Sequence, residues 1–596
     1  MRVSDRAMTK KKSLLIHAAV ITALMSIAVP LHAARGKNVI NTPHNLSVGG
    51  GKGAHDIKST VEARVCIYCH TPHHATSVTP LWSRPLSDQT YILYTPANMV
   101  ASVQQPRGPS RLCLSCHDGT IALGLLAGNV VADPSLKSLN EIPMGADPRK
   151  NSNLGTDLSD DHPISFEYTP KPELQDPSVL LAAGIKLDQE MYVECTTCHN
   201  PHNNQNGNFL VANVDVQHDA LCTLCHTMTG WAVGSDTDTA HKNGGSRYTQ
   251  SIIDQVKADG CINCHLPHSA PGAVSLQNNA KEEDTCYLSC HNGVPYANVR
   301  DEFSRTYRHP VQNFDRLHAV TEVLPLADTK KHVECVDCHN PHQAGWQSAP
   351  LDSLQLPQPS PKPLLSGPLR GVRVDNAGTT ATYEFEICFK CHAGNYADAY
   401  AVNSALRPLR QFATYDENQR FASSNPSFHP VTVDRPASAS AGRSLLVDYQ
   451  NTMKRIYCSD CHFPHGSNVA HILKDLNEET FPSLGTDYPL CSRCHDMNYL
   501  LDTATLPHSN SAALHRAHVL GVYATPGADP NRKTPCASCH DPHGVPNSRG
   551  AGPVNGARLV NFDTRYTGPV PVYNAAARSC SVAGTCHTVA APFQLY

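Results

Sequence analysis

The sequence contains few aromatic residues, a modest share of apolar residues and no long apolar run beyond its N-terminal region. Aromatic side chains make up 6% of the 596 residues and apolar side chains 40%, while there are 45 prolines. A chain of this length would normally fold into several domains with apolar cores. We therefore expect a coil-rich fold with short helices at the cysteine motifs described below and little sheet. The best later apolar stretch, Ile121–Ala132, is too short and too interrupted to span a membrane.

Positive charge is also not in excess. The formal net charge is −4, and the N-terminal segment holds more basic than acidic residues, so the remainder is more negative still. Because nucleic-acid binding depends on a basic surface, nucleic acid is not an expected partner.

Cysteine, by contrast, is abundant and ordered. All 24 cysteines fall into pairs whose second member is followed by histidine. Most pairs read C-x-x-C-H, one has three intervening residues and one has five. Numbered in chain order, motifs 1 to 12 are Cys66/Cys69/His70, Cys113/Cys116/His117, Cys195/Cys198/His199, Cys222/Cys225/His226, Cys261/Cys264/His265, Cys286/Cys290/His291, Cys335/Cys338/His339, Cys388/Cys391/His392, Cys458/Cys461/His462, Cys491/Cys494/His495, Cys536/Cys539/His540 and Cys580/Cys586/His587.

C-x-x-C-H is typical of covalent c-type haem attachment. On one helical turn, positions i, i+3 and i+4 share a face, so two thiols and an imidazole can reach one porphyrin. Zinc sites pair C-x-x-C half-sites without requiring a histidine after each, and a disulfide framework gives no reason for the repeated Cys-His dipeptides. The sequence therefore predicts twelve covalently attached haems. For Cys580 and Cys586, a local disulfide beside an incidental histidine remains an alternative.

The N-terminus has the pattern of a secretory leader. Basic residues cluster in Met1–Lys12, an apolar run covers Leu14–Val29, and small residues follow at Ala33–Ala34. We expect residues 1–33 to be a cleaved signal peptide rather than a retained anchor, which places the mature chain in the periplasm, at the outer membrane or outside the cell, with no membrane span.

A repeat appears in the residues that follow each motif. The odd-numbered motifs continue as C-H-x-P-H, and the even-numbered motifs do not. The chain therefore reads as six tandem di-haem units. We expect them at residues 34–135, 136–235, 236–305, 306–400, 401–505 and 506–596, with the haems themselves forming the core.

The same repeat supplies a second set of iron ligands. Proline disfavours helix for the residue before it, so the chain leaves the motif and the next histidine is directed away from its own haem. These histidines are His73, His202, His268, His342, His465 and His543. Another histidine precedes each unit, and the candidates are His44, His162, His241, His309, His429 and His518, with His515 close to the last.

With the twelve motif histidines as proximal ligands, these two sets suffice for bis-histidine ligation of every iron. We expect the x-P-H histidine to cap the second haem of its own unit and the upstream histidine to cap the first. Methionine ligands are not expected, since none of the nine methionines recurs in register with the units.

The alternating motifs resemble those of multihaem c-type cytochromes with doubled CxxCH motifs, such as the electron-conduit cytochromes of metal-reducing bacteria. The resemblance extends from about His44 to His587. It implies electron transfer rather than enzymatic catalysis, with other cytochromes or an outer-membrane porin as partners. Motifs 6 and 12 depart from the family spacing.

Two alternatives remain. A reductase needs an iron with an open position, which an unfilled distal site at haem 5 or 11 would provide. A filament subunit would need contacts between copies, for which His55, His471 or His508 could supply ligands across an interface.

Overall fold

The computed structural model describes residues 38–53, 55–76, 80–95, 99, 101–143, 151–214, 219–229, 231, 260–272, 274–288, 290–293, 298–311, 333–345, 365–375, 378–394, 409–412, 414, 416–435, 442–451, 453–477, 488–501, 511–520, 533–546, 557–567, 572–574, 579–582 and 591–594. The chain divides into two compact bodies. The first holds Met1–Thr227 with Ala258–Asn278, and the second holds Met228–Lys257 with Asn279–Tyr596. The division falls between motifs 5 and 6. The expected leader lies outside the described residues.

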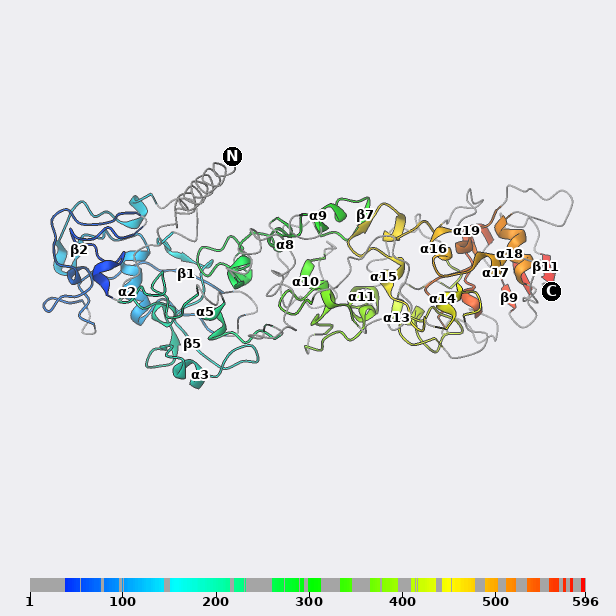
Figure 1. The fold of residues 1–596 in the computed structure, drawn as a ribbon, viewed down its shortest axis with the longest axis horizontal. Coiled ribbons are helices and arrows are strands. Elements are labelled where there is room, and N and C mark those ends of the chain that lie inside the picture. Colours follow the sequence, from blue (N-terminus) through cyan, green and yellow to red (C-terminus); the bar gives the residue numbers. More distant parts are fainter. Residues whose placement is uncertain are drawn as a thin grey trace, which may run out of the picture. The chain divides into compact units, whose positions relative to one another are not determined.

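The first body consists of short elements joined by long irregular connections (Figure 1). Its elements are η1 (Val39–Asn41), η2 (Cys66–Tyr68), β1 (Ile92–Leu93), α2 (Gly108–His117), β2 (Leu125–Leu126), η3 (Ala127–Asn129), β3 (Val130–Val131), η4 (Leu139–Glu141), β4 (Asp157–Leu158), β5 (Phe166–Glu167), α3 (Pro177–Ala182), β6 (Tyr192–Val193), α4 (Cys195–Cys198), α5 (Ala220–Thr223), η7 (Gly260–Asn263) and η8 (Val274–Leu276).

The second body has the same character. Its elements are α8 (Glu282–Tyr287), α9 (Val299–Glu302), β7 (Tyr307–Arg308), α10 (Cys335–Cys338), η9 (Gly367–Leu369), α11 (Glu384–His392), α13 (Glu417–Arg420), α14 (Val447–Gln450), α15 (Cys458–Cys461), β8 (Gly466–Ser467), η11 (Ala470–Ile472), α16 (Pro489–Ser492), α17 (Met497–Leu501), α18 (Ser511–Leu520), η12 (Cys536–Ser538), η14 (Ala557–Leu559), α19 (Thr564–Thr567), β9 (Val572–Asn574), β10 (Ser579–Val582) and β11 (Ala591–Gln594).

Sheet structure is sparse in the described residues. Strands β1 and β4 pair in parallel, whereas β2 with β3, β5 with β6 and β7 with β8 pair antiparallel, each over two residues. A three-stranded antiparallel sheet has the order β11-β10-β9. The expectation of a coil-rich fold with short helices and little sheet is confirmed. None of the described helices has the length and apolar character needed to cross a membrane.

The helical turns form at the haem-attachment motifs because of their spacing. The first cysteine of each of motifs 1 to 11 lies in a helical element. In motifs 1, 3, 4, 5, 7, 9, 10 and 11, the histidine N–H donates to the carbonyl of the first cysteine, with N···O distances of 2.8 to 3.0 Å. This i+4 bond places both cysteines and the histidine on one turn.

The helical element is shorter than expected at several motifs. We expected both cysteines of a motif to lie in the helix, but this is wrong where the element ends before the second cysteine. In motifs 5 and 10, η7 ends at Asn263 and α16 ends at Ser492, so Cys264 and Cys494 lie beyond them. The same holds at Cys69, Cys225, Cys290 and Cys539.

Backbone hydrogen bonds explain this early end. The Cys264 N–H donates to the Cys261 carbonyl, and the Cys494 N–H donates to the Cys491 carbonyl, both at 3.2 Å. These i+3 bonds close the turn, and the chain then departs from helical geometry at the histidine. The turn needed for attachment is therefore present although the helix is not continued through these cysteines.

The two motifs with unusual spacing differ from each other. In motif 6 the His291 N–H donates to the Cys286 carbonyl at 3.1 Å across five residues, so the extra residue bulges out and the turn survives. In motif 12 Cys580 lies on strand β10, paired with Phe593 and Tyr573. The expectation of a helix at every motif is therefore wrong at Cys580, since five intervening residues do not fit one turn.

The buried apolar residues form small separate clusters rather than one core. In one of them Tyr68, Leu123 and Leu139 pack with neighbouring apolar side chains against Cys69 and Cys116. Other clusters pack against Cys225, Cys338 and Cys539, which are also second cysteines of motifs. Apolar packing is therefore concentrated at the attachment cysteines.

A buried arginine organises the first of these clusters. Arg84 is fully buried, and its guanidinium donates to the carbonyls of Ser115 (3.1 Å), Ala122 (3.1 Å), Leu123 (2.6 Å) and Leu125 (3.2 Å). Ser115 lies inside motif 2, so Arg84 ties the 122–125 segment to a haem-attachment helix.

We predict that Arg84→Ala destabilises this region by about 3 kcal/mol, because several buried carbonyls lose a charged donor. Hydrogen exchange of the Leu123 and Gly124 amides, measured on the full protein, should accelerate about 100-fold. Arg64→Ala is the control, since Arg64 is exposed and bound to Glu62, and it should leave those rates unchanged. Equal exchange in both variants would contradict the role given to Arg84.

Candidate haem sites

The motif histidines are held in one tautomer by backbone carbonyls. A carbonyl oxygen can only accept, so an imidazole Nδ1 beside it must carry the proton, and Nε2 keeps its lone pair for a metal. The Nδ1–H donates in this way from His70 to Pro80 (2.8 Å), His117 to Ser152 (2.7 Å), His199 to Asn208 (2.9 Å), His265 to Ser275 (2.7 Å), His339 to Pro368 (3.0 Å), His462 to His471 (2.9 Å) and His540 to Arg558 (3.0 Å).

In most odd-numbered motifs the accepting carbonyl comes from one repeated device, which we call the return turn. After motifs 1, 3, 5, 9 and 11 the chain comes back and forms a β-bridge with the motif histidine; the bridging residues are Trp82, Leu210, Gln277, Leu473 and Val560. The accepting carbonyl lies two residues before each of them. The intervening residue has a positive φ in every case: Leu81, Phe209, Leu276, Ile472 and Leu559. Left-handed backbone at bulky residues is costly and tends to be kept at functional sites.

The return turn also binds the second cysteine of its motif. At motif 5 the Asn278 N–H, directly after the bridging Gln277, donates to the Cys264 carbonyl at 2.9 Å. The residues that follow the other bridging residues donate to Cys69, Cys198, Cys461 and Cys539 at 2.8 to 3.1 Å. The carbonyl of the second cysteine, which would accept the next hydrogen bond of a longer helix, thus accepts from the returning chain instead.

An upstream segment performs this role at two even-numbered motifs. Leu445 bridges to His495, and the next N–H, that of Leu446, donates to the Cys494 carbonyl at 2.8 Å. The Gln175 N–H donates to the Cys225 carbonyl in the same way at 2.8 Å. Cys264 and Cys494, predicted to bind haems 5 and 10, are therefore held by the same backbone pattern in spite of lying outside their helices.

A second histidine ring faces the motif histidine at nine described sites. The ring centroids are 6.0 to 6.3 Å apart. The pairs are His70 and His202 at site 1, His117 and His44 at site 2, His199 and His268 at site 3, His226 and His162 at site 4, His339 and His465 at site 7, His392 and His309 at site 8, His462 and His543 at site 9, His495 and His429 at site 10, and His540 and His515 at site 11.

This separation fits an iron with two axial imidazoles. Imidazole nitrogens bind first-row metals at about 2 Å and lie about 1 Å from their ring centroids, so one iron between two rings sets the centroids about 6 Å apart. The donor set of two thiols and two imidazoles at each of these sites is therefore the one that haem c requires.

Burial keeps these imidazoles uncharged. Burial, reinforced by nearby histidines, lowers the pKa to about 4 for His44, His162, His462, His495 and His540. A neutral imidazole is the form that coordinates a metal, so these side chains are ready to act as ligands at neutral pH.

The rings pair differently from the sequence prediction. We expected His202 to cap haem 4 and His44 to cap haem 1, but the His202 ring faces His70 of motif 1 and the His44 ring faces His117 of motif 2. The x-P-H histidines at sites 3, 7 and 9 likewise face the first motif of the preceding unit, and the upstream histidines at sites 4, 8 and 10 face the second motif of their own unit instead of the first. At site 11 the facing ring is His515, not the preferred candidate His518.

Helix packing explains the exchange. The helix of an odd-numbered motif packs against the helix of the preceding even-numbered motif, as α4 does on α2, α10 on α8 and α15 on α11. The x-P-H segment that follows is therefore already beside the preceding di-haem unit. After α4 and α15 the histidine faces the first motif of that unit rather than the second motif of its own. After α10, the described ring neighbour of His342 is Trp231.

The proline carbonyl of the same segment orients the other distal histidine. The His44 Nδ1–H donates to the Pro201 carbonyl at 3.2 Å, and the His309 and His429 Nδ1–H groups donate to the carbonyls of Pro464 and Pro542. One x-P-H segment thus acts on two sites of the preceding unit. Its histidine faces the motif histidine of the first site, as His202 does at site 1, and its proline carbonyl orients the distal histidine of the second site, as Pro201 does for His44 at site 2.

The first cysteines of neighbouring motifs meet where one di-haem unit follows another. The thiols of these cysteines lie close enough that one shifts the pKa of the other in five pairs, which are Cys113 with Cys195, Cys222 with Cys261, Cys286 with Cys335, Cys388 with Cys458 and Cys491 with Cys536. None of the cysteines whose side chains the structure describes forms a disulfide.

Second cysteines meet in the same way inside a unit. Burial first, and then the neighbouring Cys116, raise the pKa of Cys69 to about 12, and Cys225 acts in the same way on Cys198. Burial and the cysteines of motif 8 raise the pKa of Cys338 to about 12. Within each body, the motifs with described cysteine side chains therefore adjoin one another in chain order, up to motif 11.

Burial also dominates at the second cysteines of motifs 8 and 9. It raises the pKa of the Cys391 and Cys461 thiols to about 11, with the nearby carboxylates of Asp337 and Asp460 adding to the effect. Burial of this kind favours the uncharged form of the sulfur. These sulfurs are therefore placed in an apolar setting of the kind that surrounds a porphyrin.

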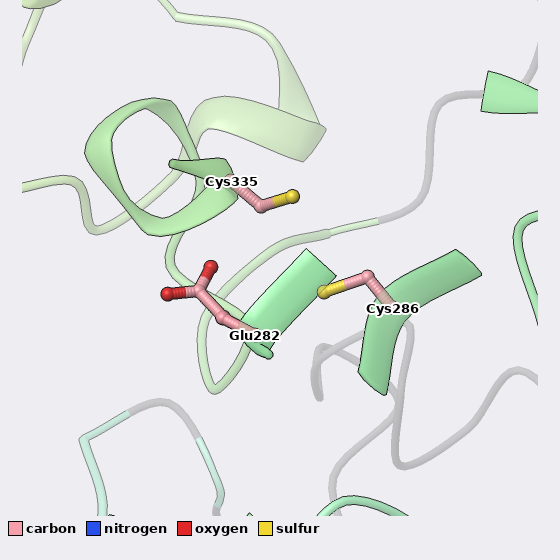
Figure 2. Close-up of side chains that lie close together, drawn as sticks. All are labelled: Glu282, Cys286 and Cys335. Carbon is pink, nitrogen blue, oxygen red and sulfur yellow. The ribbon is translucent and has the colours of Figure 1, made fainter. Parts of the chain in front are cut away.

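One of these junctions also resembles a metal site. Glu282, Cys286 and Cys335 bring ligand atoms within 4.8 Å of one another, with the two sulfurs coming from different helices (Figure 2). The Glu282 carboxylate, however, accepts from the Val336 N–H at 3.0 Å and so caps the next motif helix. Glu384 does the same for Ser459 at the junction of motifs 8 and 9. The cluster therefore belongs to the repeated haem-motif junction.

The other candidates are placed as follows. His73 is exposed, and the His342 ring lies 6.3 Å from the Trp231 ring. His291 is placed by its motif turn, and the His518 carbonyl accepts from the Thr534 N–H. His241, Cys586 and His587 lie outside the described residues, and for Cys580 only the backbone is described.

Sequence reasoning missed the return turns and the proline carbonyls, because every residue carries a carbonyl. It also missed Asp161, Glu302 and Glu417, each of which meets a distal histidine. A faint signal was available: Gly466 and Gly544 directly follow x-P-H segments, where a Cβ would collide with the backbone carbonyls of Glu302 and Arg420.

Comparison with known proteins gives one family. The profile of the doubled CXXCH motif matches residues 190–230, 254–295 and 451–498. No curated protein matches the chain. These stretches contain motif pairs 3 and 4, 5 and 6, and 9 and 10, and their paired motifs indicate covalently bound haem c, as in multihaem c-type cytochromes.

Proposed function

We propose that the protein is a dodecahaem c-type cytochrome that conducts electrons between redox partners outside the cytoplasm. The observation that carries this proposal is that described motifs which follow one another in the chain also lie side by side, as shown by α4 on α2, α11 on α10, α15 on α11, and the shared apolar cluster of Cys69 and Cys116. Because each pair of cysteines holds one porphyrin, contacts between consecutive pairs keep neighbouring porphyrins close. The path for electrons then follows the sequence within each body.

The ligand arrangement supports a carrier rather than an enzyme. Haem iron supplies one-electron oxidation and reduction when bound. At nine described sites the paired histidines would supply both imidazole ligands of a bound haem iron, and a haem held in this way would have no free position for a substrate. The ring of His515 fills site 11, which was one of the two sites considered for an open iron.

The proposed location rests on the N-terminal pattern and on the charge. The basic and apolar pattern of residues 1–33 favours export, and a periplasmic or cell-surface position suits haem attachment outside the cytoplasm. With its negative net charge the protein would favour redox partners with basic docking faces. Other cytochromes, or a porin complex in the outer membrane, are the expected partners.

The experiment that tests six-coordination is low-temperature EPR of the fully oxidised protein, integrated against its haem content. We expect low-spin ferric signals only. In His202→Ala one haem should become high spin while every haem stays attached, since the change removes one distal imidazole. His73→Ala is the matched control, because His73 occupies the same motif position but is exposed, and its spectrum should match the wild type.

The identity of the affected haem can be checked by deleting motif 1. In a Cys66→Ala, Cys69→Ala background, adding His202→Ala should produce no further high-spin signal, because its target site is already empty. A new high-spin signal in that background would show that His202 serves another haem and would overturn the pairing with His70.

The proposed haem count is tested by intact mass. We predict twelve haems in the wild type and eleven in Cys580→Ala, Cys586→Ala, with the same loss in Cys286→Ala, Cys290→Ala. Glu282→Gln should keep twelve haems, because Glu282 caps a helix and carries no haem. A haem count that stays at twelve after the Cys580 and Cys586 substitutions would show that this pair carries no haem and would favour the disulfide.

A further inference from the structure

Three distal histidines meet a carboxylate where other site histidines meet a neutral carbonyl. The His268 Nδ1 lies 3.1 Å from Asp161 Oδ1 and the His465 Nδ1 lies 2.7 Å from Glu302 Oε2, and both are hydrogen bonds. The His543 Nδ1 lies 2.9 Å from Glu417 Oε2 as a close ion-pair contact without hydrogen-bond geometry. These are the distal histidines of sites 3, 7 and 9, and all three come from x-P-H segments.

Two of these contacts are built on the same scaffold. Helix α9 ends at Glu302 and α13 ends at Arg420, and each is a single turn followed by a phenylalanine. The Phe303 ring lies 5.2 Å from the His465 ring, and the Phe421 ring lies 5.2 Å from the His543 ring.

The carboxylates nevertheless come from different positions on that scaffold. Glu302 directly precedes its phenylalanine, whereas Glu417 lies at the start of α13, one turn earlier. The third carboxylate, Asp161, directly precedes the distal histidine of site 4 and also accepts from the Ser269 N–H at 3.1 Å. A carboxylate therefore lies beside the distal histidine Nδ1 at all three sites, although it comes from a different position in the sequence each time. A contact that served only to support one local fold would not be expected to recur from different positions.

An anionic acceptor changes what the imidazole does to an iron. A charge-assisted hydrogen bond is stronger than one to a neutral carbonyl, and a carboxylate on the far nitrogen raises the basicity of the ligand. A more basic ligand stabilises the ferric state over the ferrous state, so the reduction potential falls.

We propose that Asp161 and Glu302 are positioning residues that hold the distal histidines of haems 3 and 7 through Nδ1, and that these two carboxylates, together with the charge of Glu417 beside the distal histidine of haem 9, lower the reduction potentials of these haems. This inference rests on the bis-histidine ligation of the proposed function. The effect is strongest where the carboxylate has no competing cation. Glu417 also accepts from Arg420 at 2.8 Å, whereas the Glu302 carboxylate has His465 as its ion-pair partner among the described residues.

The test uses the full holoprotein and an EPR-monitored redox titration. His465→Ala first identifies the low-spin signal of haem 7, as the signal that this variant loses. In Glu302→Gln the same signal should remain low spin but titrate at a more positive potential. We expect about a tenfold change in its ferric-to-ferrous equilibrium, which is about 59 mV for a one-electron couple.

Asp301→Asn is the matched control. Asp301 lies beside Glu302 on α9, and its carboxylate accepts from the Asn298 side chain at 2.6 Å. This variant removes the same charge from the same helix without touching His465, so the potential of haem 7 should stay at the wild-type value.

Each other outcome has a definite meaning. An unchanged potential in Glu302→Gln, or an equal shift in Asp301→Asn, would overturn the inference, because the specific contact would then have no effect on the haem. Loss of the low-spin signal in Glu302→Gln would also overturn it, by showing that Glu302 only props the ligand in place. If His465→Ala loses no signal, His465 is not a ligand, and the proposed ligation itself fails at site 7.

Discussion

The hydrogen bond from an imidazole Nδ1–H to a fixed acceptor is the interaction on which the haem sites depend. A free histidine side chain can rotate about two bonds and exchange tautomers, so a protein that must present many imidazoles in opposed pairs has to remove this freedom. Here the acceptors at the motif histidines are mostly backbone carbonyls, which cannot donate and so leave no choice of tautomer. The return turns keep bulky residues in left-handed conformations to hold those carbonyls in place.

This constraint also links one pair of motifs to another. The segments around Pro201, Pro464 and Pro542 each complete two sites of the preceding motif pair, one with the histidine and one with the proline carbonyl. One sequence repeat therefore does not hold all the histidines of its own two sites. Small apolar clusters against the second cysteines supply further packing.

The sequence could predict the parts of this arrangement that follow from spacing within one motif. The turn from Cys195 to His199 is fixed by i, i+4 geometry, and the exit after it is fixed by Pro201. The pairing of His202 with His70 could not be predicted, because it depends on which neighbouring helix α4 packs against. The helix ends before Cys264 and Cys494 were missed for a related reason, since distant backbone N–H groups take the carbonyls that a longer helix would use.

The strict alternation of motifs also has a counterpart in the ring geometry. At even-numbered sites 2, 4, 8 and 10 the two ring planes are 57° to 78° apart, whereas at odd-numbered sites 1, 3, 7, 9 and 11 they are 14° to 50° apart. The two ranges nearly meet, at 50° for His462 with His543 and 57° for His429 with His495. Upstream histidines face the even-numbered motif histidines and x-P-H histidines face most odd-numbered ones, so the tilt between the two rings follows the source of the second histidine. The repeat that is visible in the sequence therefore sets both which segment supplies the second histidine and how its ring is turned.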